Sequence, residues 1–331
     1  MNTRKLGTEG LEVSSIGLGC MGMSDFYGAR NDADSMATLS AALQTGVNFW
    51  DTSDIYGPHT NEQLLGRYFK ENPKARNNVI LATKFGVLRS ESGDFLGFNG
   101  RPEYVQQACE DSLQRLGVDH IDLYYQHRMD PAVPIEETIG AMADLVTQGK
   151  IRYLGLSEAG AETLKRASKV HPISALQSEY SLWSQHLKGS VLPACEELGI
   201  GLVPYSPLGR GFLTGAIQSR NDLDADDWRL QNPRFSEENF QQNLVLVDRI
   251  KEMALEKSCS PAQLALAWIL HQGPDYVSIP GTRSAVRVKE NAKAVEVSLS
   301  RDDLAQIATN ISSDSVFGSR YSKPMMAALD S

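Results

Sequence analysis

Four polar side chains of different chemistry lie in the N-terminal part of the chain: Asp51, Tyr56, Lys84 and His127. Each lies at the end of an apolar run or a few residues beyond one. Reduction of a carbonyl group requires a hydride and a proton for the developing alkoxide. A phenol, with a pKa of about 10, exchanges protons poorly until a nearby cation favours its ionised form. A tyrosine, a lysine, a carboxylate and an imidazole therefore suit this chemistry.

We expect each of these residues to have its own role. Tyr56 would donate the proton, and Lys84 would supply the cation that favours the ionised phenol. Asp51 would hold the ammonium group and balance its charge. His127, expected to be neutral, would hydrogen-bond the substrate oxygen and orient it. Taken singly, such residues are more often structural, as helix caps, surface aromatics, solvated charges or strand-end histidines. Their joint spacing is what favours a catalytic site.

The elements that must position these side chains follow from the hydropathy pattern. Short apolar runs alternate with amphipathic segments, as in repeated βα units with a parallel sheet. We expect eight strands, at residues 16–19, 49–51, 79–82, 121–125, 153–156, 175–177, 201–204 and 277–279. In a (β/α)8 barrel the loops that follow the strands converge on one pocket. The expected fold class is therefore an α/β TIM (β/α)8 barrel, with residues 1–331 as a single domain.

Three segments add to this alternation. Residues 3–6 and 11–14 are joined by turn residues, which indicates an N-terminal β-hairpin that could plug the bottom of a barrel. Residues 210–239 are expected to form a long loop after strand seven, too polar to pack as core. Residues 261–271 indicate an extra helix before strand eight. Among the other expected helices are residues 35–44, 102–116, 135–147 and 240–257.

Composition excludes several classes of function. The net charge of -9 leaves no basic excess for nucleic acid or an anionic membrane surface. No run approaches the roughly 20 apolar residues of a membrane span, and the first residues lack the apolar run of a signal peptide. We therefore expect a cytoplasmic protein. The 4 cysteines form no CxxC pair and are expected to be reduced, and the histidines show no metal-ligand spacing, so no metal is predicted.

A glycine-rich segment offers an alternative fold. Residues 17–22 match the GxGxxG pattern of dinucleotide-binding Rossmann domains, with Asp51 as a possible ribose-binding acid. That motif must open a helix at once, whereas residues 23–31 contain Asp, Gly and Asn before any helical periodicity. We therefore assign Gly19, Cys20 and Met21 to the first βα loop, where they would line the pocket.

The segments that carry the four polar residues resemble those of a known family. Residues 48–57 (NFWDTSDIYG), 82–86 (ATKFG) and 122–128 (DLYYQHR) are similar to the Asp, Tyr, Lys and His segments of the aldo-keto reductases. The resemblance continues through GLSE (155–158), QSEY (177–180), YSPLGRG (205–211) and IPGTR (279–283), and spans nearly the whole chain. It implies a (β/α)8 barrel that uses NADP(H) to reduce a small-molecule aldehyde or ketone.

The resemblance also implies a cofactor site. Ser157 and Gln177 would hydrogen-bond the nicotinamide carboxamide, and Tyr205 would stack on its ring. Backbone amides would face the pyrophosphate at Ser206, Leu208 and Gly211. The adenosine end would be surrounded by Gly281, Thr282, Arg283, Arg287, Glu290 and Asn291. Two positions depart from many relatives: Glu158 stands where Asn is common, and Gly281 where some have Lys.

The two arginines bear on the choice of cofactor. Guanidinium groups bind phosphate oxygens bidentately, so Arg283 and Arg287 would suit the 2′-phosphate of NADP(H). Four residues apart, they could also form an exposed helix face.

The loop at 210–239 is expected to fold over the pyrophosphate as a lid.

Several questions stay open at this level. Arg128 could face the pocket and favour an anionic or dicarbonyl substrate, or pair with a loop carboxylate. Trp228 and Tyr321 could close over substrate or only cap the barrel. Because some relatives serve as channel-associated β subunits, a cofactor-binding regulatory subunit without significant turnover is the alternative function. The physiological substrate and the oligomeric state are not readable from the sequence.

Overall fold

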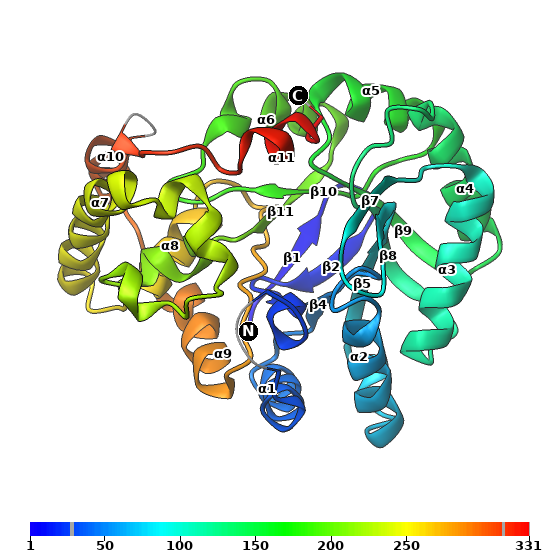
Figure 1. Cartoon of the computed structure of the whole chain (residues 1–331), viewed down its shortest axis with the longest axis horizontal. Helices are drawn as coiled ribbons and strands as arrows, with labels where there is room; N and C mark the ends of the chain where they lie inside the picture. Colours follow the sequence, from blue (N-terminus) through cyan, green and yellow to red (C-terminus); the bar gives the residue numbers. More distant parts are fainter. Residues whose placement is uncertain (27–29, 313–314, 331) are drawn as a thin grey trace.

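Parallel strands form the centre of the computed structural model, which describes residues 1–26, 30–312 and 315–330. Seven of them pair in the order β3–β4–β5–β8–β9–β10–β11. Their bounds are β3 Leu18–Gly19, β4 Phe49–Asp51, β5 Ile80–Phe85, β8 Ile121–Gln126, β9 Ile151–Ser157, β10 Ala175–Glu179 and β11 Gly201–Tyr205. Helices surround these strands (Figure 1). Fully buried side chains inside and outside the sheet make up the core. The expected α/β TIM barrel is confirmed.

The barrel closes through a segment that is not a regular strand. The expectation of a regular strand at 277–279 is wrong, because this segment forms isolated bridges and no continuous ladder. Ser278 pairs with Ile16, and Tyr276 pairs with Leu202. The amide of Ile279 donates to Pro204 O at 3.1 Å, and that of Gly17 to Ser278 O at 2.8 Å. Pro204 and Pro280 lack the amide hydrogens that a continuous ladder needs. The first strand is also shorter than expected, since only Leu18–Gly19 pairs regularly with β4.

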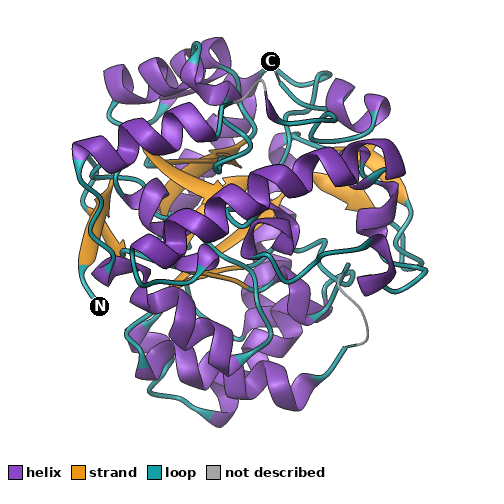
Figure 2. Ribbon diagram, turned by 90° about the vertical axis from the view of Figure 1, so that its left-hand side faces the viewer, coloured by secondary structure: helices purple, strands orange, loops and turns teal. Residues whose placement is uncertain are grey.

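The helices that cover the barrel follow the strands in sequence. They are α1 Asp32–Gln44, α2 Thr60–Glu71, α3 Pro102–Leu116, α4 Ile135–Thr147, α5 Ala161–Val170, α6 Val191–Leu198, α7 Glu237–Glu256, α8 Pro261–Leu270, α9 Ala285–Ala292, α10 Arg301–Asn310 and α11 Lys323–Ala327. Figure 2 shows them outside the strands. The expected extra helix before the closing segment is α8, and Ser260 caps it in a capping box with Gln263. Helices α1 and α7 begin three residues earlier than expected, because Asn31 and Ser236 cap them. None of the described helices combines the length and apolarity needed to cross a membrane.

The N-terminal hairpin closes one end of the barrel. It consists of β1 Thr3–Leu6 and β2 Leu11–Ser14, paired antiparallel. Leu6, Leu11 and Val13 are buried in the same cluster as the barrel-interior residues Phe49 and Tyr125. A main-chain hydrogen bond anchors the hairpin turn to the barrel: the amide of Thr8 donates to Gly199 O at 3.0 Å. The expected plug is therefore present.

The long segment that follows β11 is ordered by four short 3-10 helices. These are η4 Gly209–Thr214, η5 Arg220–Asp222, η6 Trp228–Gln231 and η7 Pro233–Phe235. The expectation that this segment is too polar to pack as core is wrong. Phe212, Leu213 and Phe235 are fully buried, and Phe212 stacks on Trp183 with ring centroids 5.2 Å apart. These apolar residues are spaced too irregularly among acidic ones to give a periodic signal.

Two further segments frame the mouth of the barrel. A second hairpin, β6 Val87–Arg89 with β7 Phe95–Phe98, follows β5 and was not expected. The C-terminal segment runs from α10 past β10 and β11 to α11, drawn in red in Figure 1. It is held there by the amide of Gly160, which donates to Asp330 Oδ2 at 2.8 Å. The mouth therefore lies at the end of the barrel opposite the β1–β2 hairpin.

Candidate active site

The structure brings together the four residues expected to be catalytic. Asp51 is the last residue of β4, Lys84 lies in β5, and His127 directly follows β8. Lys84 Nζ donates to Asp51 Oδ1 at 2.5 Å, to Thr52 O at 2.8 Å and to the Tyr56 hydroxyl at 3.4 Å. Parallel pairing of β4 with β5 and of β5 with β8 sets this geometry, because strand ends in register face one pocket.

The lysine and the aspartate form a buried ion pair. Lys84 is fully buried and Asp51 is 2 % exposed. Burial lowers the pKa of Lys84, and the Asp51 carboxylate opposes this through its charge and its hydrogen bond. The second carboxylate oxygen accepts a hydrogen bond from Gln177 Nε2 at 2.8 Å. Asp51 therefore holds the ammonium group next to the phenol.

Tyr56 is kept in its protonated form. Burial raises the pKa of Tyr56 well above its usual value, the Asp51 charge adds to this effect, and the Arg128 guanidinium opposes it. The Lys84 ammonium contacts the hydroxyl and lies 5.1 Å from the ring centroid. A protonated phenol with a cation at its oxygen is suited to giving up its proton to an alkoxide.

His127 is neutral. Burial lowers the pKa of His127 well below its usual value, and the charges of Arg128 and Lys84 lower it further. Its Nδ1 lies 3.1 Å from Ser53 Oγ. Nε2 has no hydrogen-bond partner among the described residues. The imidazole ring meets the Tyr56 ring edge to face, with centroids 5.9 Å apart.

The three residues expected at the nicotinamide end lie beside this group. Ser157 ends β9, Tyr205 ends β11, and Gln177 in the intervening β10 is in register with Ser157. Ser157 Oγ accepts a hydrogen bond from Arg128 Nη1 at 3.1 Å. The hydroxyls of Tyr205 and Tyr321 are 2.8 Å apart.

The loop expected at the pyrophosphate is sharply bent. Ser206 and Gly211 have positive φ values of 48° and 92°. Leu208 precedes η4, and its carbonyl accepts a hydrogen bond from the Gly211 amide at 3.0 Å. The Gly211 amide is thus used within the turn, and it could reach a phosphate only if this turn opened. Gly209 and Gly211, both with positive φ, signal a turn in the sequence, whereas the left-handed conformation of Arg210 between them has no local signal.

The residues expected at the adenosine end gather around the start of α9. Gly281 bridges to Gly19 across the barrel seam, and Thr282 is buried. Helix α9 begins at Ala285, capped by Ser284, so Arg287 lies in its first turn as expected. The remaining members of this group are Arg283, which is half-buried, Arg287, which is exposed, Glu290 in α9, and the buried Asn291. Two guanidinium groups beside a helix N-terminus, next to a glycine, form a donor set that fits a phosphate-bearing cofactor.

The structure adds residues whose roles the sequence did not reveal. Both carboxylate oxygens of Glu158 accept hydrogen bonds from the guanidinium of Arg320 in the C-terminal segment, Oε1 at 2.9 Å and Oε2 at 3.0 Å. Burial acts to raise the pKa of Glu158, but the Arg320 hydrogen bonds and charge, helped by Arg128, lower it to about 2. These partners are far apart in sequence. In the sequence, the sole sign that this position is unusual was that Glu158 stands where many relatives have Asn.

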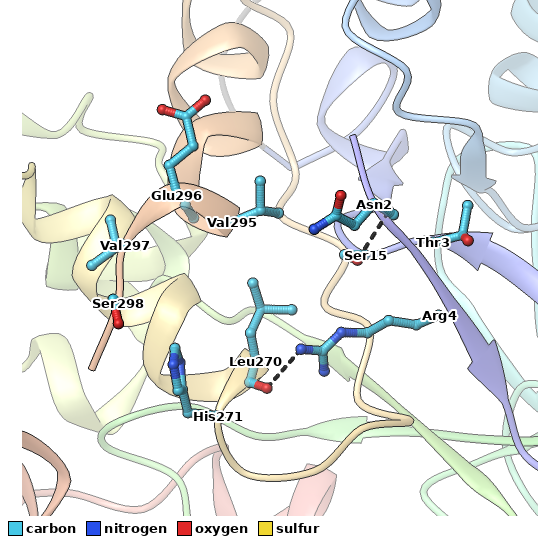
Figure 3. Close-up of a pocket in the computed structure, with 11 residues that line it drawn as sticks. Asn2, Thr3, Arg4, Ser15, Leu270, His271, Val295, Glu296, Val297 and Ser298 are labelled. Carbon is cyan, nitrogen blue, oxygen red and sulfur yellow. Dashed lines mark hydrogen bonds between the residues drawn. The ribbon is translucent and has the colours of Figure 1, made fainter. Parts of the chain in front are cut away.

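A cavity of about 430 Å³ lies at the other end of the molecule, beside the β1–β2 hairpin (Figure 3). Its lining includes Arg4, which donates to Leu270 O at 2.8 Å, and His271, whose Nδ1 lies 2.8 Å from Ala267 O. These groups hydrogen-bond the main chain, so they hold the fold at this cavity. Within the described residues, no cluster of His, Cys, Asp or Glu could hold a metal ion.

Comparison with known proteins agrees with this geometry. The sequence model of the aldo/keto reductase family matches residues 15–311, and the chain belongs to this family of oxidoreductases, which act on small carbonyl compounds with nicotinamide cofactors.

Solved structures of relatives are similar over nearly the full length. The glycerol dehydrogenase AKR11B4 from Gluconobacter oxydans is 28% identical, with a TM-score of 0.84 over 94% of this chain and 96% of that one. The holo form of the aldo-keto reductase AKR11C1 from Bacillus halodurans is 27% identical, with a TM-score of 0.78 over 95% and 97%. A thermostable aldo-keto reductase in complex with the inhibitor epalrestat is 27% identical, with a TM-score of 0.74 over 94% and 100%.

Proposed function

We propose that this protein catalyses the reduction of an aldehyde or ketone to the alcohol, with NADPH supplying the hydride when it is bound. The observation that carries this proposal is the contact of Lys84 Nζ with both Asp51 and the Tyr56 hydroxyl. That contact places a fixed cation at the oxygen of the proton donor. Its value for catalysis is that it stabilises negative charge as the proton leaves.

In this mechanism the substrate oxygen lies between two donors. Tyr56 gives it a proton as the alkoxide develops, and Nε2 of His127 hydrogen-bonds it and fixes its direction. Because His127 is neutral, it can orient the oxygen without competing as an acid. Lys84 stabilises the ionised Tyr56, and Asp51 keeps the ammonium in place. Burial of all four side chains excludes water and strengthens these interactions.

The cofactor would be held along the mouth of the barrel. Ser157 and Gln177 would hydrogen-bond the carboxamide, and Tyr205 would pack on the ring, which selects the face turned to the substrate. Ser206 and Leu208 would offer backbone amides to the pyrophosphate. The adenosine end would lie among the residues from Gly281 to Asn291.

We further propose NADP(H) as the preferred cofactor. Arg283 and Arg287 would bind the 2′-phosphate, a group that NAD(H) lacks. A cytoplasmic location and the absence of a nucleic-acid partner remain predictions from composition.

A substrate screen tests the proposed function. NADPH consumption would be followed with a panel of aldehydes, ketones and sugars that includes 4-nitrobenzaldehyde, and we expect turnover with at least one class. Binding of NADPH would be measured in parallel by fluorescence. Tight binding without turnover across the panel would instead support the regulatory-subunit alternative.

A further inference from the structure

Arg128 is a charged group next to the expected catalytic residues, and no carboxylate of the described residues pairs with it. It follows His127 at the end of β8, and the residue is partly buried. Nη1 donates to the His127 carbonyl at 2.7 Å and to Ser157 Oγ at 3.1 Å. Both acceptors are neutral. In the part of the chain that the structure describes, Arg128 forms no ion pair.

Other arginines at this end of the barrel have acidic partners. Arg210 and Arg234 pair with Glu179 at 2.9 and 3.2 Å, and Arg320 pairs with Glu158 at 2.9 Å. Glu158 is also the acid whose charge acts on Arg128, but Arg320 occupies both of its oxygens. The charges of those arginines are therefore already used to hold loops and the C-terminal segment in place.

An unpaired charge in this position is costly to the fold. Removal of a guanidinium from water costs free energy unless a counter-ion or several hydrogen bonds replace the solvent. Among the residues that the structure describes, Arg128 has two acceptors, both neutral, whereas a guanidinium carries five N–H donors in a planar fork. Such a fork matches the two oxygens of a carboxylate.

The guanidinium also acts on the reacting groups. Arg128 directly follows His127 and hydrogen-bonds to the His127 carbonyl and to Ser157 Oγ, so it lies beside the residues expected to bind the substrate oxygen. Its charge acts to lower the pKa of both Tyr56 and His127. A ligand group bound by Arg128 would thus belong to the substrate and lie near its carbonyl.

We infer that Arg128 binds a carboxylate of the substrate, and that the preferred substrates are carbonyl compounds with a carboxylate close to the carbonyl group. This inference rests on the proposed carbonyl reduction and names its substrate class. Arg128 would supply the counter-charge from a fixed position, and the carboxylate would orient the carbonyl toward Tyr56 and His127.

Matched aromatic aldehydes test the inference. The ortho, meta and para isomers of carboxybenzaldehyde would be compared with the corresponding carboxamides, which have similar shape but no charge. For at least one isomer we expect kcat/KM of the wild type to favour the carboxylate by about 10-fold or more, as expected for a charge-assisted hydrogen bond. Arg128→Gln should bring that ratio close to one, and Arg128→Lys should retain part of it, because Lys keeps the charge but loses the fork.

The ratio separates substrate binding from a structural role. If Arg128 only positions Ser157 or Tyr56, Arg128→Gln lowers kcat/KM for both members of each pair equally, and the inference is overturned. Arg152→Gln is the matched control, since Arg152 lies near the start of β9, is largely exposed and pairs with Asp122. It should leave the ratio unchanged.

The remaining outcomes are equally decisive. A ratio near one for all three isomers in the wild type overturns the substrate class but leaves carbonyl reduction intact. Absence of turnover with every aldehyde overturns both. Should Arg128→Gln fail to fold, inhibition of the wild type decides: benzoate should compete with the aldehyde far better than benzamide, and equal inhibition would contradict the inference.

Discussion

The ammonium of Lys84 lies 2.5 Å from Asp51 Oδ1, and both side chains are almost completely shielded from water. Replacement of Lys84 by Met removes the counter-ion and leaves Asp51 buried, with Gln177 as its side-chain partner among the described residues. We expect Lys84→Met to lose about 3 to 5 kcal/mol in free energy of unfolding, as is typical when one member of a buried pair is removed. Urea denaturation measures the change.

The double variant Lys84→Met/Asp51→Asn is the control for this prediction. It leaves no isolated charge, so it should recover part of the lost stability while remaining inactive. If the single variant unfolded at the same urea concentration as the wild type, the pair would be exposed to solvent and not buried.

The ion pair between Glu158 and Arg320 predicts that the stability of the fold depends on pH. The pKa of Glu158 is lowered to about 2 in the folded protein from an ordinary value of 4.5, so the folded state favours the ionised form. The stabilisation is fully present above pH 4.5 and is lost as the pH falls toward about 2. We therefore expect Glu158→Gln to be less stable than the wild type at neutral pH, with the difference shrinking in this range.

Thermal melting across this pH range checks the pH dependence. Glu162→Gln is the matched control, because it removes an exposed pair with Lys165 that solvent and salt screen. The difference between wild type and control should vary little with pH. A constant difference for Glu158→Gln would show that its carboxylate is not ionised through the pair.

We expect the choice of cofactor to depend on the two arginines at the start of α9. Replacement of both Arg283 and Arg287 by Ala should weaken NADPH binding by on the order of 100-fold, since charge-assisted hydrogen bonds contribute roughly 1.5 to 3 kcal/mol each. NADH binding should hardly change. Fluorescence titration of both cofactors measures this, and equal losses would mean that the arginines support the fold or the adenine instead.

The segment after β11 is expected to cover the pyrophosphate. Its stretch at 218–226 is mostly exposed, whereas Phe212 and Phe235 on either side are anchored in the core. We expect saturating NADPH to slow proteolytic cleavage within this stretch. Cleavage at the same rate with and without NADPH would exclude a lid that closes on the cofactor.

The sequence was sufficient for elements whose signal is local. Strand β4 has the expected bounds, and the ends of β4, β5 and β8 carry Asp51, Lys84 and His127, because parallel strands align their ends. Contacts between distant segments gave no such signal. Glu158 meets Arg320, and Tyr205 meets Tyr321, only because the C-terminal segment folds back over the mouth. The expected eighth strand is not regular because Pro204 and Pro280, on two neighbouring segments, lack the amide donors of a ladder. The effect of a missing donor can be judged only when the strand pairing is known.

Tyr56→Phe tests the central claim most directly, because it removes one oxygen and leaves the ring in place. NADPH consumption with an aldehyde that the wild type reduces, such as 4-nitrobenzaldehyde, would be measured for both proteins, together with NADPH binding by fluorescence. General acid catalysis contributes about 100- to 10,000-fold, so kcat should fall by that factor while NADPH affinity stays nearly unchanged. If Tyr56→Phe retained more than about a tenth of the wild-type rate, Tyr56 would not be the proton donor.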